Sequence, residues 1–237
     1  MEIVAFYMLF MNSVILVMTF YAIWKWSKQK ELHFYDINLL FGFFFLFLFL
    51  GKSIRTLYIL IYFTTCLPNL LIILKLRYML IILTGTPLIY LGLNAITHSK
   101  SNSNKIRNKN DKLILNSIIL LITVTFQSIV VLTAPDLSFM NIILLLIHIP
   151  SLIWISGTFY YAFKKGKCTE IKPQIISLAF LIDLILFISS SFIILPNRSS
   201  SGFSPFYIIF TELIDLMIII IIFLGYFLES KYSIQNN

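Results

Sequence analysis

The sequence predicts an all-α polytopic membrane protein, a seven-transmembrane-helix bundle with its N-terminus outside and its C-terminus inside. Hydrophobic residues make up 59% of the 237 residues and the mean hydropathy is +0.93, whereas soluble domains are about 45–50% apolar. Apolar runs recur that are long enough to cross a membrane core, which takes about 20 helical residues. Basic residues gather in alternate connections between these runs. We therefore expect a single transmembrane domain over residues 1–237.

Each expected span is an apolar run bounded by charged or turn-forming residues. The spans are residues 3–24, 37–62, 69–96, 113–133, 138–163, 174–195 and 206–228. The first ends in Trp24-Lys25-Trp26, an aromatic and basic segment typical of a membrane–water interface. The second is rich in Phe, and the third contains Pro87, which membrane helices tolerate. The fourth follows the polar stretch 98–112.

The last three spans enclose ionisable side chains. The fifth contains His148 and is separated from the fourth by a tight turn over 134–137. The sixth contains Asp183, and the seventh contains Glu212 and Asp215. A charged side chain costs about 2.5–3.5 kcal/mol at the bilayer centre on insertion scales. We therefore expect the acidic residues to face protein and to find partners there.

An alternative division of the chain has eight spans. It breaks the second run at residues 51–55 and the third at residues 75–77, where basic residues interrupt the apolar pattern. Its second helix would be residues 37–50, which is short for a crossing. The breaks also lack the Asn, Pro or multiple Gly residues that mark tight turns. These observations favour seven spans.

The distribution of basic residues predicts the orientation. The connections after the first, third, fifth and seventh spans hold thirteen of them: Lys25, Lys28, Lys30, Lys100, Lys105, Arg107, Lys109, Lys112, Lys164, Lys165, Lys167, Lys172 and Lys231. The N-terminus and the other connections hold only Arg198. Because cytoplasmic loops carry the excess of Lys and Arg, the N-terminus is predicted to lie outside. We expect the protein in the plasma (cytoplasmic) membrane. Cys66 and Cys168 then lie on opposite sides of the membrane.

This bias also accounts for the net charge of +8. We therefore expect no nucleic-acid partner. The inner basic loops are instead expected to contact the lipid bilayer through anionic lipid headgroups, at about 1 kcal/mol per basic residue near the surface.

Eight polar residues within the spans form the candidate ligand site. They are Lys52, Arg55, Lys75, Arg77, His148, Asp183, Glu212 and Asp215. Counting from the span ends places them between the outer surface and the midplane. Glu212 and Asp215 are three positions apart and share one helical face. Because grouped opposite charges neutralise one another, we expect at least one of the four cations to contact Glu212 or Asp215.

Two interpretations of this group remain open. In the functional one, the residues line an outward-facing polar site for a ligand, an ion or a proton. In the structural one, they form ion pairs, and Lys52, Arg55 and Lys75 extend to the outer interface. His148 is then a helix–helix hydrogen-bonding residue. The three acidic side chains are too short to reach the interface, so they are the stronger candidates.

Catalytic and metal-binding motifs are absent from the sequence. It contains no HExxH, GxSxG, P-loop or CxxC motif. Asp183 and Asp215 lack the glycine-rich context of membrane aspartyl proteases. The sequence therefore predicts no enzyme, no cofactor and no metal site.

Two short segments resemble microbial rhodopsins. Arg77-Tyr78 followed by residues 84–88 is similar to the third helix of that family, and Asp215 resembles an aspartate of the seventh. The resemblance implies a retinal-binding lysine four residues after Asp215, where this chain has Ile219. No lysine lies in the seventh span, so a retinal pigment is excluded and membership of the family is not predicted.

Three classes of function fit these observations. A receptor or sensor would detect an outside ligand and signal to an intracellular partner through the basic loops. A transporter or channel would use the same charges to pass a small solute or a proton. An accessory subunit would fill out a larger complex through intramembrane protein contacts. We favour the receptor-like class, since repeats and paired broken helices typical of transporters are not evident.

Overall fold

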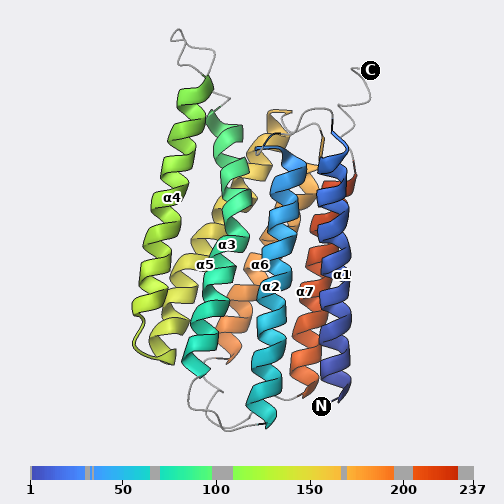
Figure 1. Cartoon of the computed structure of the whole chain (residues 1–237), viewed down its shortest axis with the longest axis vertical. Helices are drawn as coiled ribbons and strands as arrows, with labels where there is room; N and C mark the ends of the chain where they lie inside the picture. The colour runs from blue at the N-terminus through green and yellow to red at the C-terminus, as the bar shows by residue number, and fades with distance from the viewer. Residues whose placement is uncertain are drawn as a thin grey trace. The chain divides into compact units, whose positions relative to one another are not determined.

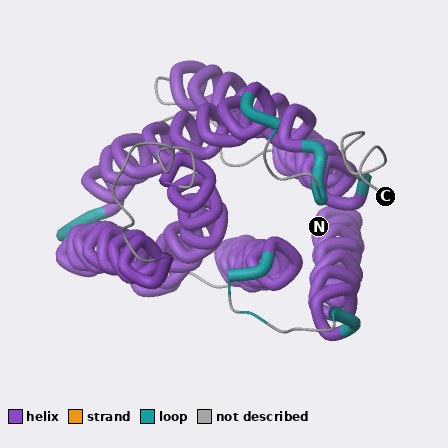
Figure 2. Tube along the Cα trace, turned by 90° about the horizontal axis from the view of Figure 1, so that it is seen from above, coloured by secondary structure: helices purple, strands orange, loops and turns teal. Residues whose placement is uncertain are grey.

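The computed structural model describes residues 2–29, 33, 35–64, 70–97, 109–166, 170–194 and 205–228. These residues form seven α-helices and no strand (Figure 1, Figure 2). The helices are α1 (Glu2–Ser27), α2 (Ile37–Thr64), α3 (Leu70–Thr97), α4 (Lys109–Thr133), α5 (Leu137–Lys164), α6 (Pro173–Ile194) and α7 (Pro205–Phe227). The all-α, seven-helix prediction is confirmed.

The helices have the length and composition of membrane spans. Among the described residues, six of the seven are long and apolar enough to cross a membrane, and α6 contains a shorter apolar stretch, Pro173–Ser189. The chain is therefore a multi-pass membrane protein by its helix composition. The alternative with eight spans is wrong, because α2 continues through residues 51–55 and α3 through residues 75–77. Orientation and the identity of the membrane stay predictions.

Aspartate side chains mark where two helices begin. The Phe139 amide donates to Asp136 Oδ1 at 2.7 Å in the first turn of α5. Before α2, the Asp36 carbonyl accepts from the Leu40 amide at 3.0 Å, and Asp36 Oδ2 accepts from the His33 amide at 3.1 Å. Such caps satisfy amides that have no partner within the helix or the preceding turn.

Contacts divide the chain into two compact units, which are described separately. The first unit comprises Met1–Met11 and Ile149–Asn237, and the second comprises Asn12–His148. The prediction of a single transmembrane domain is not tested by this division. Cys66, Cys168, Arg198 and most of the stretch 98–112 lie outside the described residues.

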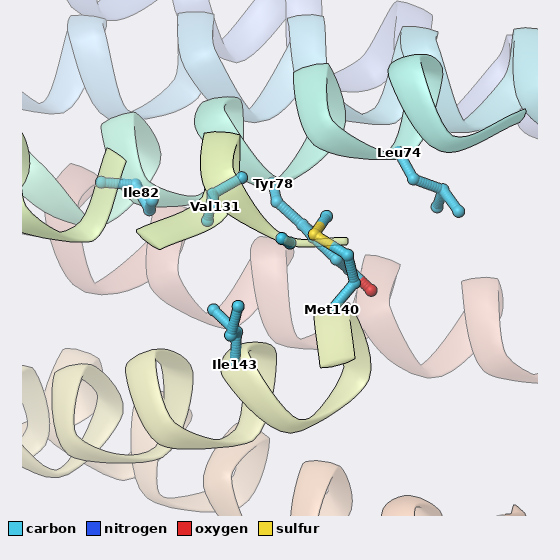
Figure 3. Packing of buried hydrophobic residues seen from close by; sticks show 7 residues of the cluster. Leu74, Tyr78, Ile82, Val131, Met140 and Ile143 are labelled. Atoms are coloured by element: carbon cyan, nitrogen blue, oxygen red, sulfur yellow. The ribbon is translucent and has the colours of Figure 1, made fainter. Parts of the chain in front are cut away.

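In the second unit, α3 packs against both α2 and α4. Figure 3 shows side chains of α3, α4 and α5 that point into one shared apolar space. The cluster consists of Leu74, Tyr78, Ile82, Val131, Ala134, Met140 and Ile143. Two side-chain hydrogen bonds join neighbouring helices, from Asn12 Nδ2 to Thr56 Oγ1 at 3.2 Å and from Asn116 Nδ2 to Asn94 Oδ1 at 2.7 Å. Membrane helices use such bonds to satisfy polar groups away from water.

In the first unit, α6 packs against α7 and is hydrogen-bonded to α5. Ser156 Oγ donates to the Ser177 carbonyl at 3.0 Å, and Ser177 Oγ donates to the Ser156 carbonyl at 2.9 Å. The Lys172 amide donates to the Gly225 carbonyl at 2.7 Å. These contacts hold α6 against both α5 and α7.

Candidate functional site

Helix α7 has one exposed apolar face and one buried face. The exposed large residues are Phe206, Phe210, Leu213, Met217, Leu224 and Phe227. Glu212 lies on the buried face with Ile208, Ile222 and Tyr226, and only 1% of its surface is exposed. Asp215 is half-buried on the edge of the same face. The Glu212 carboxylate is therefore enclosed by protein, as expected for an acidic residue within a span.

Tyr7 of α1 is a neighbour that the sequence did not single out. Its phenol lies within electrostatic range of both Glu212 and Asp215. The Tyr7 hydroxyl oxygen is buried and has no hydrogen-bond partner among the described residues. Tyr7 and Glu212 lie at similar distances from the starts of α1 and α7, but neighbouring residues of α1 do so too, and the sequence therefore did not distinguish Tyr7. Two carboxylates and a phenol thus occur together in the first unit.

Asp183 belongs to the same unit and is half-buried on α6. Because α6 packs against α7, Asp183 lies on a helix adjacent to the other two acidic residues. The contact between α6 and α7 is the relation that the structure shows between Asp183 and the other two acidic residues, so their grouping stays a prediction.

The second unit contains the four cations and His148. Lys52 and Arg55 are half-buried on α2, Arg77 is half-buried on α3, and His148 is half-buried on α5. They belong to a different unit from the acidic residues, so the predicted ion pairs stay predictions.

Lys75 has a defined contact within the second unit. Its Nζ donates to the Leu132 carbonyl, next to the last residue of α4, at 2.7 Å. The final carbonyls of a helix lack partners within it and carry partial negative charge, which a lysine complements. Lys75 therefore joins α3 to the end of α4. This contact favours the structural interpretation for this one residue.

The chemistry available in the first unit is that of oxygen ligands and proton exchange. A carboxylate accepts hydrogen bonds or a proton, and a phenol both donates and accepts. No group of three or more His, Cys, Asp or Glu residues within the described ranges is arranged to hold a metal ion. Glu212, Asp215 and Tyr7 are suited to a polar ligand, a small cation or a proton.

Comparison with known proteins gives no relative from which a site can be transferred. No family model, no curated protein and no solved structure matches the chain.

Proposed function

We propose that this multi-pass membrane protein is a receptor- or sensor-like module whose ligand site is built around Glu212, Asp215 and Tyr7. The observation that carries the proposal is the burial of Glu212 inside a membrane span, where the Tyr7 phenol lies in electrostatic range of both the Glu212 and the Asp215 carboxylates. An acidic side chain is expensive in a membrane, and such residues mark ligand, ion or proton sites by default.

The depth of these residues suggests access from outside. With the N-terminus outside, α1 and α7 both begin at the outer surface, and Tyr7 and Glu212 lie about two turns from those ends. A ligand in this position reaches the acidic residues without crossing the membrane. Signalling would then pass to an intracellular partner through the inner basic connections.

The proposal is tested by thermal unfolding of the purified protein in nanodiscs, with sodium, ammonium and methylamine as separate probes. A ligand at a hundredfold excess over its Kd stabilises the folded state by about 2.7 kcal/mol. We expect at least one probe to raise the Tm of the wild type. The rise should be lost in Glu212→Gln and weakened in Tyr7→Phe, which keeps every charge. Glu170→Gln is the matched control, since Glu170 is an exposed acid of the same unit.

Two further measurements separate the receptor-like function from its alternatives. The protein is reconstituted in liposomes to measure ion and proton flux, and it is purified from its native membrane to identify bound subunits. We expect no flux and no stoichiometric membrane partner. Flux that depends on Glu212 would assign the chain to transport, and a stable membrane complex would assign it to the accessory-subunit class. An equal rise in Tm on adding the probe to wild type and to Glu212→Gln would show that the proposed site is wrong.

A further inference from the structure

The last turn of α1 and the residues just after it hold two buried polar atoms without a hydrogen-bond partner in the described part of the chain. Trp26 Nε1 and Gln29 Oε1 are both buried, and neither forms a hydrogen bond within the described part of the chain. The Gln29 backbone amide donates to the Trp26 backbone carbonyl at 3.0 Å. This hydrogen bond brings the backbone of Gln29, just beyond the end of α1, close to that of Trp26. Native proteins pair more than nine-tenths of such buried groups, so the pair indicates that something is missing here.

The surroundings of Trp26 are those of a membrane–water boundary. The apolar span of α1 runs over Ile3–Ser27, so Trp26 lies at its end. Lys25 is half-buried and Lys28 is exposed. The Lys28 ammonium lies 6.0 Å from the centroid of the exposed Trp24 ring. Tryptophan and lysine in this position are typical of the level of the lipid headgroups.

We propose that this turn binds the headgroup of an anionic glycerophospholipid, with phosphatidylglycerol as the representative ligand. A phosphate oxygen accepts the Trp26 indole N–H, and the glycerol hydroxyl of the headgroup donates to Gln29 Oε1. The two atoms that lack partners are thus one donor and one acceptor, and this headgroup supplies one of each. Because both atoms are covered in this structure, the Trp26 and Gln29 side chains both rotate to admit the headgroup.

The two lysines are needed because the helix itself does not attract an anion at this end. The C-terminus of a helix carries a partial negative charge of about half an electron. The Lys25 and Lys28 ammonium groups offset that charge and add the attraction for the phosphate, about 1 kcal/mol each for a basic residue near an anionic leaflet, or roughly fivefold in binding. The same headgroup without acyl chains lacks the anchoring that keeps it at this depth.

The test uses the full chain in nanodiscs of phosphatidylcholine with one-fifth phosphatidylglycerol. After extraction in a mild detergent, native mass spectrometry measures the phosphatidylglycerol that stays bound. We expect Trp26→Phe, which removes the N–H but keeps an aromatic ring, to lower the bound fraction about tenfold, as for loss of a charge-assisted hydrogen bond. Lys28→Met is expected to lower it severalfold. Trp24→Phe is the matched control, because its side chain is exposed on the same turn, and its bound fraction should stay within twofold of the wild type.

Each other outcome overturns the proposal. Equal losses in Trp24→Phe and Trp26→Phe would mean general aromatic anchoring at the interface. Retention unchanged in both Trp26→Phe and Lys28→Met would mean that Trp26 and Gln29 pair with each other or with water. Full competition by soluble glycerol phosphate would assign the turn to a soluble phosphate rather than to lipid. Thermal unfolding in pure phosphatidylcholine checks that each variant is folded. If Trp26→Phe does not fold, the phosphatidylglycerol retained by Lys28→Met tests the proposal instead.

Discussion

The predicted pairing of Glu212 with Arg55 has a measurable consequence: Glu212→Gln should lower the free energy of unfolding by about 3–5 kcal/mol, and adding Arg55→Gln should restore much of that loss. The physical reason is that water cannot replace a partner at Glu212, since only 1% of that residue is exposed. Removing one member of a buried ion pair leaves the other charge uncompensated. Removing both members takes away the attraction together with the cost of burying the charges.

The measurement is a double-mutant cycle in thermal unfolding, repeated for Asp215→Asn and Arg77→Gln. A non-additive term of 0.5–3 kcal/mol is typical of interacting residues, on the order of what we expect here. Glu170→Gln serves as an exposed acidic control and should change stability by less than about 0.5 kcal/mol. Strictly additive losses in both cycles would show that neither pair interacts.

Gly225→Ala is expected to destabilise the protein by about 1–3 kcal/mol through overpacking where α6 meets α7. A Cβ atom at Gly225 would lie 2.7 Å from Ile176 Cγ1 and 3.2 Å from the Ile176 backbone nitrogen. The side chain of Ile176 is fully buried and the backbone cannot yield by rotation, so the two helices must move apart.

Gly157→Ala is the control for this effect. A Cβ atom there would meet nothing within 4 Å, and alanine favours a helix over glycine by up to about 1 kcal/mol. We therefore expect Gly157→Ala to be neutral or stabilising in the same unfolding assay. Equal effects of the two substitutions would show that the α6–α7 contact at Gly225 is not close enough to constrain stability.

The helices were predictable from sequence because membrane spans are long and apolar. The continuity of α2 through Lys52 and Arg55 was predictable from the length of the apolar run, since a break there would leave a helix too short to cross the membrane. The burial of Glu212 was predictable from the free-energy cost of placing a charged side chain in hydrocarbon, where an acid on the lipid-facing side of α7 would lie. Both inferences need only local composition and the thickness of a bilayer.

Side-chain contacts between distant segments were not predictable in the same way. Tyr7 is one aromatic residue among many in the chain, and only its proximity to Glu212 and Asp215 distinguishes it. Lys75 was grouped with the polar site by its depth, yet its ammonium reaches the Leu132 carbonyl. A single sequence gives the depth of a residue in a span, but it does not give the rotation of each helix about its own axis, which decides such contacts.

The most direct test of a seven-span protein with an outward-facing polar site is cysteine labelling in intact cells. Ser138→Cys and Lys165→Cys are made separately in a background where Cys66 and Cys168 are replaced by Ser. Both positions are exposed, at the start of α5 and just after its end. A membrane-impermeant maleimide should label Ser138→Cys in intact cells and Lys165→Cys only after permeabilisation. Labelling of Lys165→Cys in intact cells, with Ser138→Cys protected, would reverse the orientation and close the proposed site to outside ligands.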